Sequence, residues 1–175
     1  MTNKRLIITE IIGLLICLVL SFVFHFAFEW FHRTTGIAWL FATNESVWEH
    51  SKIIFYPYLI FSIIEYFIIK PDIKVFLTAK SIPLMLAIPL MLIIFYTYSG
   101  IIGKSIVAVD ITIAILIIYL MFFISYKIIM KGYISNWYIV FTIIAILIVL
   151  LLIIFTYFPP HIKLFYDILD KKYGI

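Results

Sequence analysis

The sequence predicts an all-α polytopic membrane protein, built as a bundle of five transmembrane helices. Composition is the first reason: of the 175 residues, 66% are hydrophobic and 13% are charged, and the mean hydropathy is +1.21, whereas soluble domains are about half apolar. The second is the length of the apolar runs, since a helix needs about 20 residues to cross a bilayer. These runs also lack the apolar–polar alternation of spanning strands. We therefore expect a single integral membrane domain over residues 1–175, multi-pass in the cell membrane and in contact with the lipid bilayer.

The first two spans are expected at about residues 6–31 and 52–69. The first run is longer than the apolar core of a signal peptide, and no small-x-small cleavage site follows it. We therefore expect it to remain as an uncleaved helix. The second run is short, but its helix would begin earlier if Ser46 were its N-cap.

The remaining spans are expected at about residues 82–98, 106–126 and 137–157. The third contains Pro89, which predicts a kink that neighbouring helices accommodate. The fifth is stopped by two prolines at 159–160, because neither donates an amide hydrogen. The apolar tail that follows would turn back, either as a lid over the mouth of the bundle or along the membrane.

The basic residues predict an N-terminus inside and a C-terminus outside. With this orientation the inner loops carry seven basic residues and the two outer loops carry three, as the positive-inside rule requires. The inner residues are Lys4, Arg5, Lys70, Lys74, Lys80, Lys127 and Lys131, and the outer ones are Arg33, Lys52 and Lys104. The charges are spread singly, so no basic face for nucleic acid is expected. Cys17 is the only cysteine, which excludes a disulfide framework within the chain and a cysteine-based metal site.

This topology places the four histidines on the outer half of the protein. His25 and Glu29 share one helix face at the end of the first span. The segment 44–50 (NESVWEH) adds His50, and His161 follows the last span. Imidazole and carboxylate bind zinc and other divalent first-row metals, so we expect His25, Glu29, His50 and His161 to be candidate metal ligands.

The same outer face supplies candidate catalytic groups, namely Glu45, Glu49 and His50. A carboxylate beside a metal-bound water can act as a general base, and a His–Glu pair can do acid–base work without a metal. A structural interpretation stands beside this one. Ser46 and Glu49 match the capping box, in which the N-cap hydroxyl and the N3 carboxylate satisfy the first backbone amides of a helix. Capping leaves His50 unexplained.

Two further acids, Glu10 and Glu65, lie near the inner ends of the first two spans. They could pair with an interfacial lysine such as Lys4 or Lys70. They could also form a cytoplasmic-side path for protons or cations.

Three segments resemble a bacterial family of small polytopic membrane proteins of unknown function. They are 44–50 (NESVWEH), 159–167 (PPHIKLFYD) and 173–175 (YGI). The resemblance covers the whole chain and implies that the two outer motifs belong to one site, but it brings no known substrate or reaction.

The sequence leaves three functions open. The first is an integral membrane protein with an outer-face His/Glu site that binds a metal or hydrolyses a substrate. The second is a component of a small-molecule or ion transporter, which needs a cavity reaching toward the midplane beside Glu65 or Asp110. The third is a structural or regulatory protein whose polar motifs cap and lock the helices. The sequence identifies no protein partner.

Overall fold

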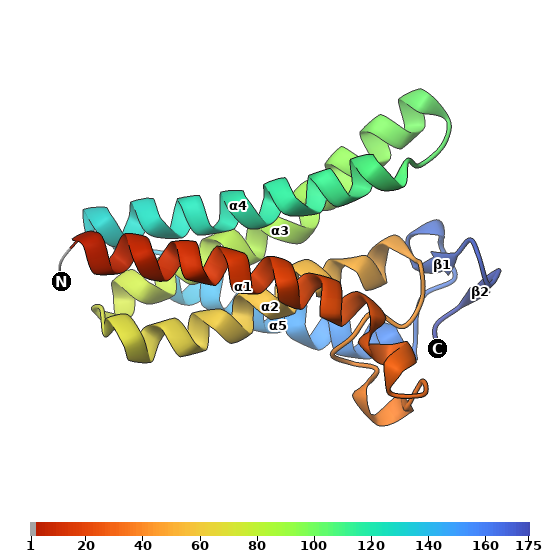
Figure 1. The fold of residues 1–175 in the computed structure, drawn as a ribbon, viewed down its shortest axis with the longest axis horizontal. Coiled ribbons are helices and arrows are strands. Elements are labelled where there is room, and N and C mark those ends of the chain that lie inside the picture. Colours follow the sequence, from red (N-terminus) through yellow and green to blue (C-terminus); the bar gives the residue numbers. More distant parts are fainter. Residues whose placement is uncertain (1–2) are drawn as a thin grey trace.

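The computed structural model describes residues 3–175 as five long helices followed by a short C-terminal tail (Figure 1). Each of the five helices is long and apolar enough to cross a membrane, which confirms the predicted all-helical architecture. They are α1 (Asn3–Trp30), α2 (Val47–Ile69), α3 (Ile73–Ile102), α4 (Val107–Lys131) and α5 (Tyr138–Tyr157). The side of the membrane that each terminus faces stays a prediction.

Successive helices run in opposite directions, so the two chain termini lie at opposite ends of the bundle (Figure 1). We call these the N-terminal end and the C-terminal end. Helix α1 packs against α2 and α4, and α3 packs against α4 and α5. The end of α3 and the start of α4 lean away from the other helices at the C-terminal end (Figure 1).

The third helix is longer than predicted. It begins at Ile73 rather than at residue 82, because Asp72 caps it by accepting hydrogen bonds from the backbone amides of Lys74 and Val75 at 2.9 and 3.2 Å. It then continues through Pro89 to Ile102. The lysines of its first two turns lower the local hydropathy, which is why the apolar run alone placed the start too late.

Aromatic rings fill the centre of the bundle. Tyr58 and Phe61 of α2 meet Phe122 of α4, with ring centroids 5.0 and 5.8 Å apart. Gly13 of α1 allows this approach, since a Cβ there would overlap the Phe61 ring. Outside the core the helices expose many apolar side chains, and α5 is the most apolar of the five. That distribution fits helices in contact with lipid.

The tail after α5 folds back over the C-terminal end of the bundle. It forms a short 3-10 helix (Lys163–Phe165) and a two-stranded antiparallel pairing of β1 (Tyr166–Asp167) with β2 (Lys172–Tyr173). The buried Phe165 ring packs on Trp48 at the start of α2, with centroids 5.2 Å apart. The predicted return of the tail is therefore observed, whereas the strand pairing was not predicted.

Candidate functional site

Two histidines and a glutamate converge at the C-terminal end of the bundle. His25 comes from α1, His50 from the first turn of α2, and Glu45 from the loop between these helices. The two Nε2 atoms are 3.2 Å apart. The Glu45 carboxylate lies 3.4 Å from Nε2 of His50 and 3.9 Å from Nε2 of His25. We call these three residues the His/Glu cluster.

A backbone carbonyl orients the His50 ring. Nδ1 of His50 lies 2.9 Å from the carbonyl oxygen of Ser46. A carbonyl oxygen only accepts, so Nδ1 carries the proton and donates. In the neutral ring the lone pair is then on Nε2, the atom that faces His25 and Glu45. This second-sphere hydrogen bond is typical of metal-binding histidines.

The His/Glu cluster also suits a shared proton. When His50 is protonated, Nε2–H donates to Glu45, and this hydrogen bond lowers the pKa of the Glu45 carboxyl. Burial of that carboxyl opposes the shift. The cluster is therefore poised to hold positive charge between its three side chains, either a proton or a cation.

The spacing of the donor atoms matches metal coordination. Zn–N bonds of 2.0–2.1 Å at a tetrahedral angle place two imidazole nitrogens about 3.3 Å apart. The observed separation of 3.2 Å agrees with this value. The three side chains can each offer one ligand atom, and these atoms lie within 4.8 Å of one another. Three protein ligands leave a fourth position for water or substrate.

Glu49, one residue before His50, is buried and is occupied by contacts outside the His/Glu cluster. Its Oε2 accepts from the backbone amide and the hydroxyl of Thr43, both at 2.9 Å, and pairs with Lys52 at 2.7 Å. Its Oε1 accepts from the Thr156 hydroxyl on α5 at 3.2 Å. Glu49 therefore ties the loop, α2 and α5 together.

Ser46 caps α2 as predicted, but Glu49 does not complete the capping box. The Ser46 hydroxyl accepts from the backbone amide of Glu49 at 3.3 Å. The backbone amide of Ser46 donates to the side chain of Asn44 at 2.9 Å, in place of the Glu49 carboxylate. Lys52 explains the difference, because its buried ammonium group draws that carboxylate inward.

The 44–50 segment is joined directly to the tail. The side-chain amide of Asn44 donates to the carbonyl of Gly174 at 2.9 Å. The backbone amide of Glu45 donates to the buried carboxylate of Asp167 at 3.1 Å. These contacts hold the backbone that presents Glu45, which accounts for the proximity of the two motifs.

Two predicted metal ligands lie outside the His/Glu cluster. Glu29 forms an exposed ion pair with Arg33 at 2.9 Å. The exposed ring of His161 stacks on Tyr173, with centroids 4.5 Å apart. Within residues 3–175, the only grouping of three metal-ligating side chains is His25, Glu45 and His50.

Three polar residues that contact Glu49 were not anticipated as its partners. Lys52 was counted as an outer-loop charge, although its position three residues after Glu49 is an ion-pair spacing on a helix. The contacts of Thr43 and Thr156 with Glu49 have no comparable sequence signal. Asp110, near the start of α4, accepts from the Tyr98 hydroxyl and takes no part in the His/Glu cluster.

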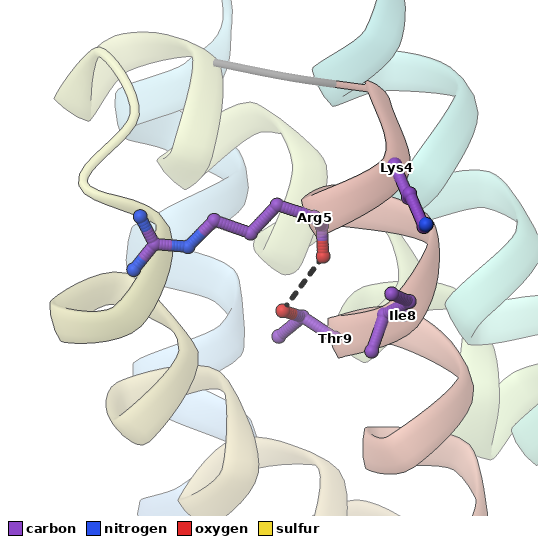
Figure 2. Close-up of a pocket in the computed structure, with 4 residues that line it drawn as sticks. All are labelled: Lys4, Arg5, Ile8 and Thr9. Carbon is purple, nitrogen blue, oxygen red and sulfur yellow. Dashed lines mark hydrogen bonds between the residues drawn. The ribbon is translucent and has the colours of Figure 1, made fainter.

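A cavity lies at the N-terminal end of the bundle. It has a volume of about 280 Å³ and is lined by Lys4, Arg5, Ile8 and Thr9 (Figure 2). The Thr9 hydroxyl donates to the carbonyl of Arg5, and the Arg5 guanidinium caps α2 by donating to the carbonyl of Ile68 at 2.7 Å. Among residues 3–175, no acidic side chain lines this cavity, and the Arg5 guanidinium is accounted for by its capping bond to α2.

Five apolar helices with a polar cluster at one end place the molecule in the class of multi-pass helical membrane proteins. The chain belongs to a family of unknown function (DUF6512), whose model matches residues 2–175. No curated protein and no solved structure matches the chain. Functional inference therefore depends on the geometry of its own residues.

Proposed function

We propose that this protein binds a divalent transition-metal ion, with zinc as the best fit, through Nε2 of His25, Nε2 of His50 and the Glu45 carboxylate. The observation that carries the proposal is the convergence of these three groups from α1, α2 and the intervening loop. With the predicted orientation, the site lies at the outer face of the membrane.

The electrostatics of the His/Glu cluster favour a cation. Two neutral imidazoles and one carboxylate carry a single negative charge, which a divalent ion more than balances. The two imidazoles are half-buried and the carboxylate is 43% exposed, so an ion can reach the cluster from water. Imidazole and carboxylate together suit zinc and its first-row neighbours.

An open fourth position gives the site hydrolytic potential. Zinc lowers the pKa of a bound water to about 7 and so makes hydroxide available at neutral pH. In this arrangement Glu45 and His50 are ligands. Glu49 is a positioning residue, because its two oxygens are committed to Lys52, Thr43 and Thr156.

Metal analysis of the purified protein tests the proposal. His25→Ala and His50→Ala should lose bound zinc, and Glu45→Gln should weaken binding because an amide is a poorer ligand than a carboxylate. His32→Ala and His161→Ala are matched controls, since both histidines are exposed and lie outside the cluster. The controls should retain the zinc content of the wild type. Cobalt substitution adds an optical signature of tetrahedral coordination.

A purely structural role for the His/Glu cluster gives a different pattern. In that case His25→Ala and His50→Ala would lower the melting temperature of metal-free protein, and zinc content would not follow the substitutions. Equal zinc content in all five variants and the wild type would overturn the metal proposal.

A further inference from the structure

A second polar cluster is buried near the N-terminal end of the bundle, and each of four helices contributes one residue. These are Glu10 from α1, Glu65 from α2, Lys80 from α3 and Ser125 from α4. Their exposures are 5%, 0%, 4% and 0%. We call them the Glu/Lys cluster. The pairing of the two acids with a lysine is therefore observed, but the lysine is Lys80 rather than Lys4 or Lys70.

Lys80 is the centre of the Glu/Lys cluster. Its ammonium lies 2.5 Å from Glu65 Oε2, 2.6 Å from the Ser125 hydroxyl and 3.5 Å from Glu10 Oε1. The Ser125 hydroxyl in turn donates to Glu10 Oε1 at 2.8 Å. The three ammonium hydrogens are thereby directed at three partners.

One oxygen of each carboxyl group has no partner. Glu10 Oε2 and Glu65 Oε1 are buried and make no hydrogen bond with any residue in 3–175. Buried polar atoms are nearly always hydrogen-bonded, so two such atoms in one cluster call for an explanation.

The charges of the Glu/Lys cluster are also unbalanced. Two carboxylates face one ammonium, and Lys80 is the only basic side chain in residues 3–175 that forms a salt bridge with either acid. The other groups packed around it are apolar or neutral. Lys80 lies 5.3 Å from the ring centroid of Tyr58 and 5.8 Å from that of Phe122, and the buried thiol of Cys17 adds no positive charge. Helix α5 contains no acidic, basic or histidine residue.

We infer that the two carboxyl groups of Glu10 and Glu65 share one exchangeable proton, which makes the Glu/Lys cluster a proton-binding site within the bundle. Burying an unbalanced charge is far more costly than binding a proton that neutralises it. A proton held between two neighbouring carboxyl groups removes the repulsion between two like charges. A protonated carboxyl also supplies the hydrogen that the two unpaired oxygens lack.

Glu10 is the member of the pair with access to the surface. It lines a cavity of about 260 Å³ between α1 and α4, whose other walls are apolar and aromatic and include Tyr119 and Tyr126. Glu65 is fully buried. Glu10 is therefore the acid through which the proton enters and leaves, and Glu65 shares the proton as its partner across Lys80, which contacts both carboxyl groups.

Infrared spectroscopy of the purified protein in lipid bilayers tests the inference, through the C=O stretch of a protonated carboxyl group. The wild type should show this band at neutral pH, and the band should shift in deuterium oxide. Glu10→Gln and Glu65→Gln should each abolish it, because the remaining acid then pairs with Lys80 as a carboxylate. Both substitutions are nearly isosteric and leave one carboxylate to balance Lys80, so the fold should persist, as size-exclusion chromatography can check.

Glu45→Gln is the control, since it removes an acid at the opposite end of the bundle and should leave the band unchanged. A wild type without the band at neutral pH would overturn the inference, as would a band that persists in both cluster variants. Sodium titration tests whether a metal cation, instead of a proton, balances the charge of the Glu/Lys cluster. If sodium stabilises the wild type but not Glu10→Gln, and the band is absent, the balancing charge is a metal cation and not a proton.

Discussion

Replacing Lys52 with methionine should destabilise the protein far more than removing an ordinary surface lysine. The side chain is fully buried, and its ammonium donates to Glu49 at 2.7 Å and to the carbonyls of Ala38 and Phe41 at 2.9 and 3.2 Å. Methionine fills a similar volume but makes none of these bonds. Glu49 would be left as a buried carboxylate without a counter-charge.

The expected cost follows from these contacts. Removing one partner of a buried ion pair costs about 3–5 kcal/mol. Each buried carbonyl that loses its donor costs about 1–3 kcal/mol more where water cannot replace it. Glu49 keeps its bonds to Thr43 and Thr156, which limits the loss. We therefore expect Lys52→Met to lower the free energy of unfolding by at least about 3 kcal/mol, the lower limit for a broken buried ion pair.

Arg33→Met is the matched control. Arg33 lies in the turn that follows α1 and also pairs with a glutamate, at 2.9 Å from Glu29, but the two side chains are 57% and 64% exposed. An exposed pair contributes about 0–1 kcal/mol. Unfolding by denaturant in bicelles, followed by circular dichroism, compares the two variants under the same conditions.

A double-substituted protein separates the charge effect from packing. Glu49→Gln combined with Lys52→Met removes both charges, so its loss of stability should be smaller than the sum of the two single losses. The reasoning fails if Lys52→Met costs no more than Arg33→Met. Since Lys52 also holds the loop that carries Glu45, zinc affinity should fall in Lys52→Met and stay unchanged in Arg33→Met.

Two further predictions concern helix packing and metal binding. Gly13→Ala should cost about 1–3 kcal/mol of unfolding free energy, because the new methyl group meets the Phe61 and Phe122 rings. Gly100→Ala, where the helix has open space, should instead be neutral or stabilising by up to about 1 kcal/mol, and equal effects in the two variants would contradict the packing argument. Zinc affinity, measured by competition with a chromophoric chelator, should fall as pH is lowered, because protons compete with the metal for the ring nitrogens of His25 and His50. An affinity independent of pH between about 5 and 8 would argue against imidazole ligands.

The sequence predicted the helices themselves more completely than the contacts between polar side chains on different helices. Five apolar runs predicted five helices, and Ser46 was found as the N-cap of α2. The start of α3 was missed although Asp72 is a capping residue type, because Lys74 and Lys80 interrupt the apolar run. Lys80 was counted as an inner-loop charge, whereas it lies buried within α3, and nothing in the spacing from Glu10 or Glu65 indicates that all three meet.

The grouping of the outer-face residues was anticipated only in part, because the sequence does not show which side chains from different segments meet. His25 and His50 were expected on one face of the protein, and they lie together. Glu29 and His161 were expected with them, but Glu29 turns to Arg33 and His161 stacks on Tyr173. Placing a residue at one end of a bundle does not determine the direction of its side chain.

That this protein is a set of apolar helices follows from its local sequence. Hydropathy and length are local properties, and a backbone in lipid must satisfy its hydrogen bonds within each helix. Which polar groups meet is fixed by tertiary packing. That outcome depends on the rotation of each helix, which close packing such as that at Gly13 sets, and on the return of the tail, which Asp167 fastens to the loop that carries Glu45. The His/Glu cluster and the Glu/Lys cluster are therefore products of packing between segments far apart in the chain.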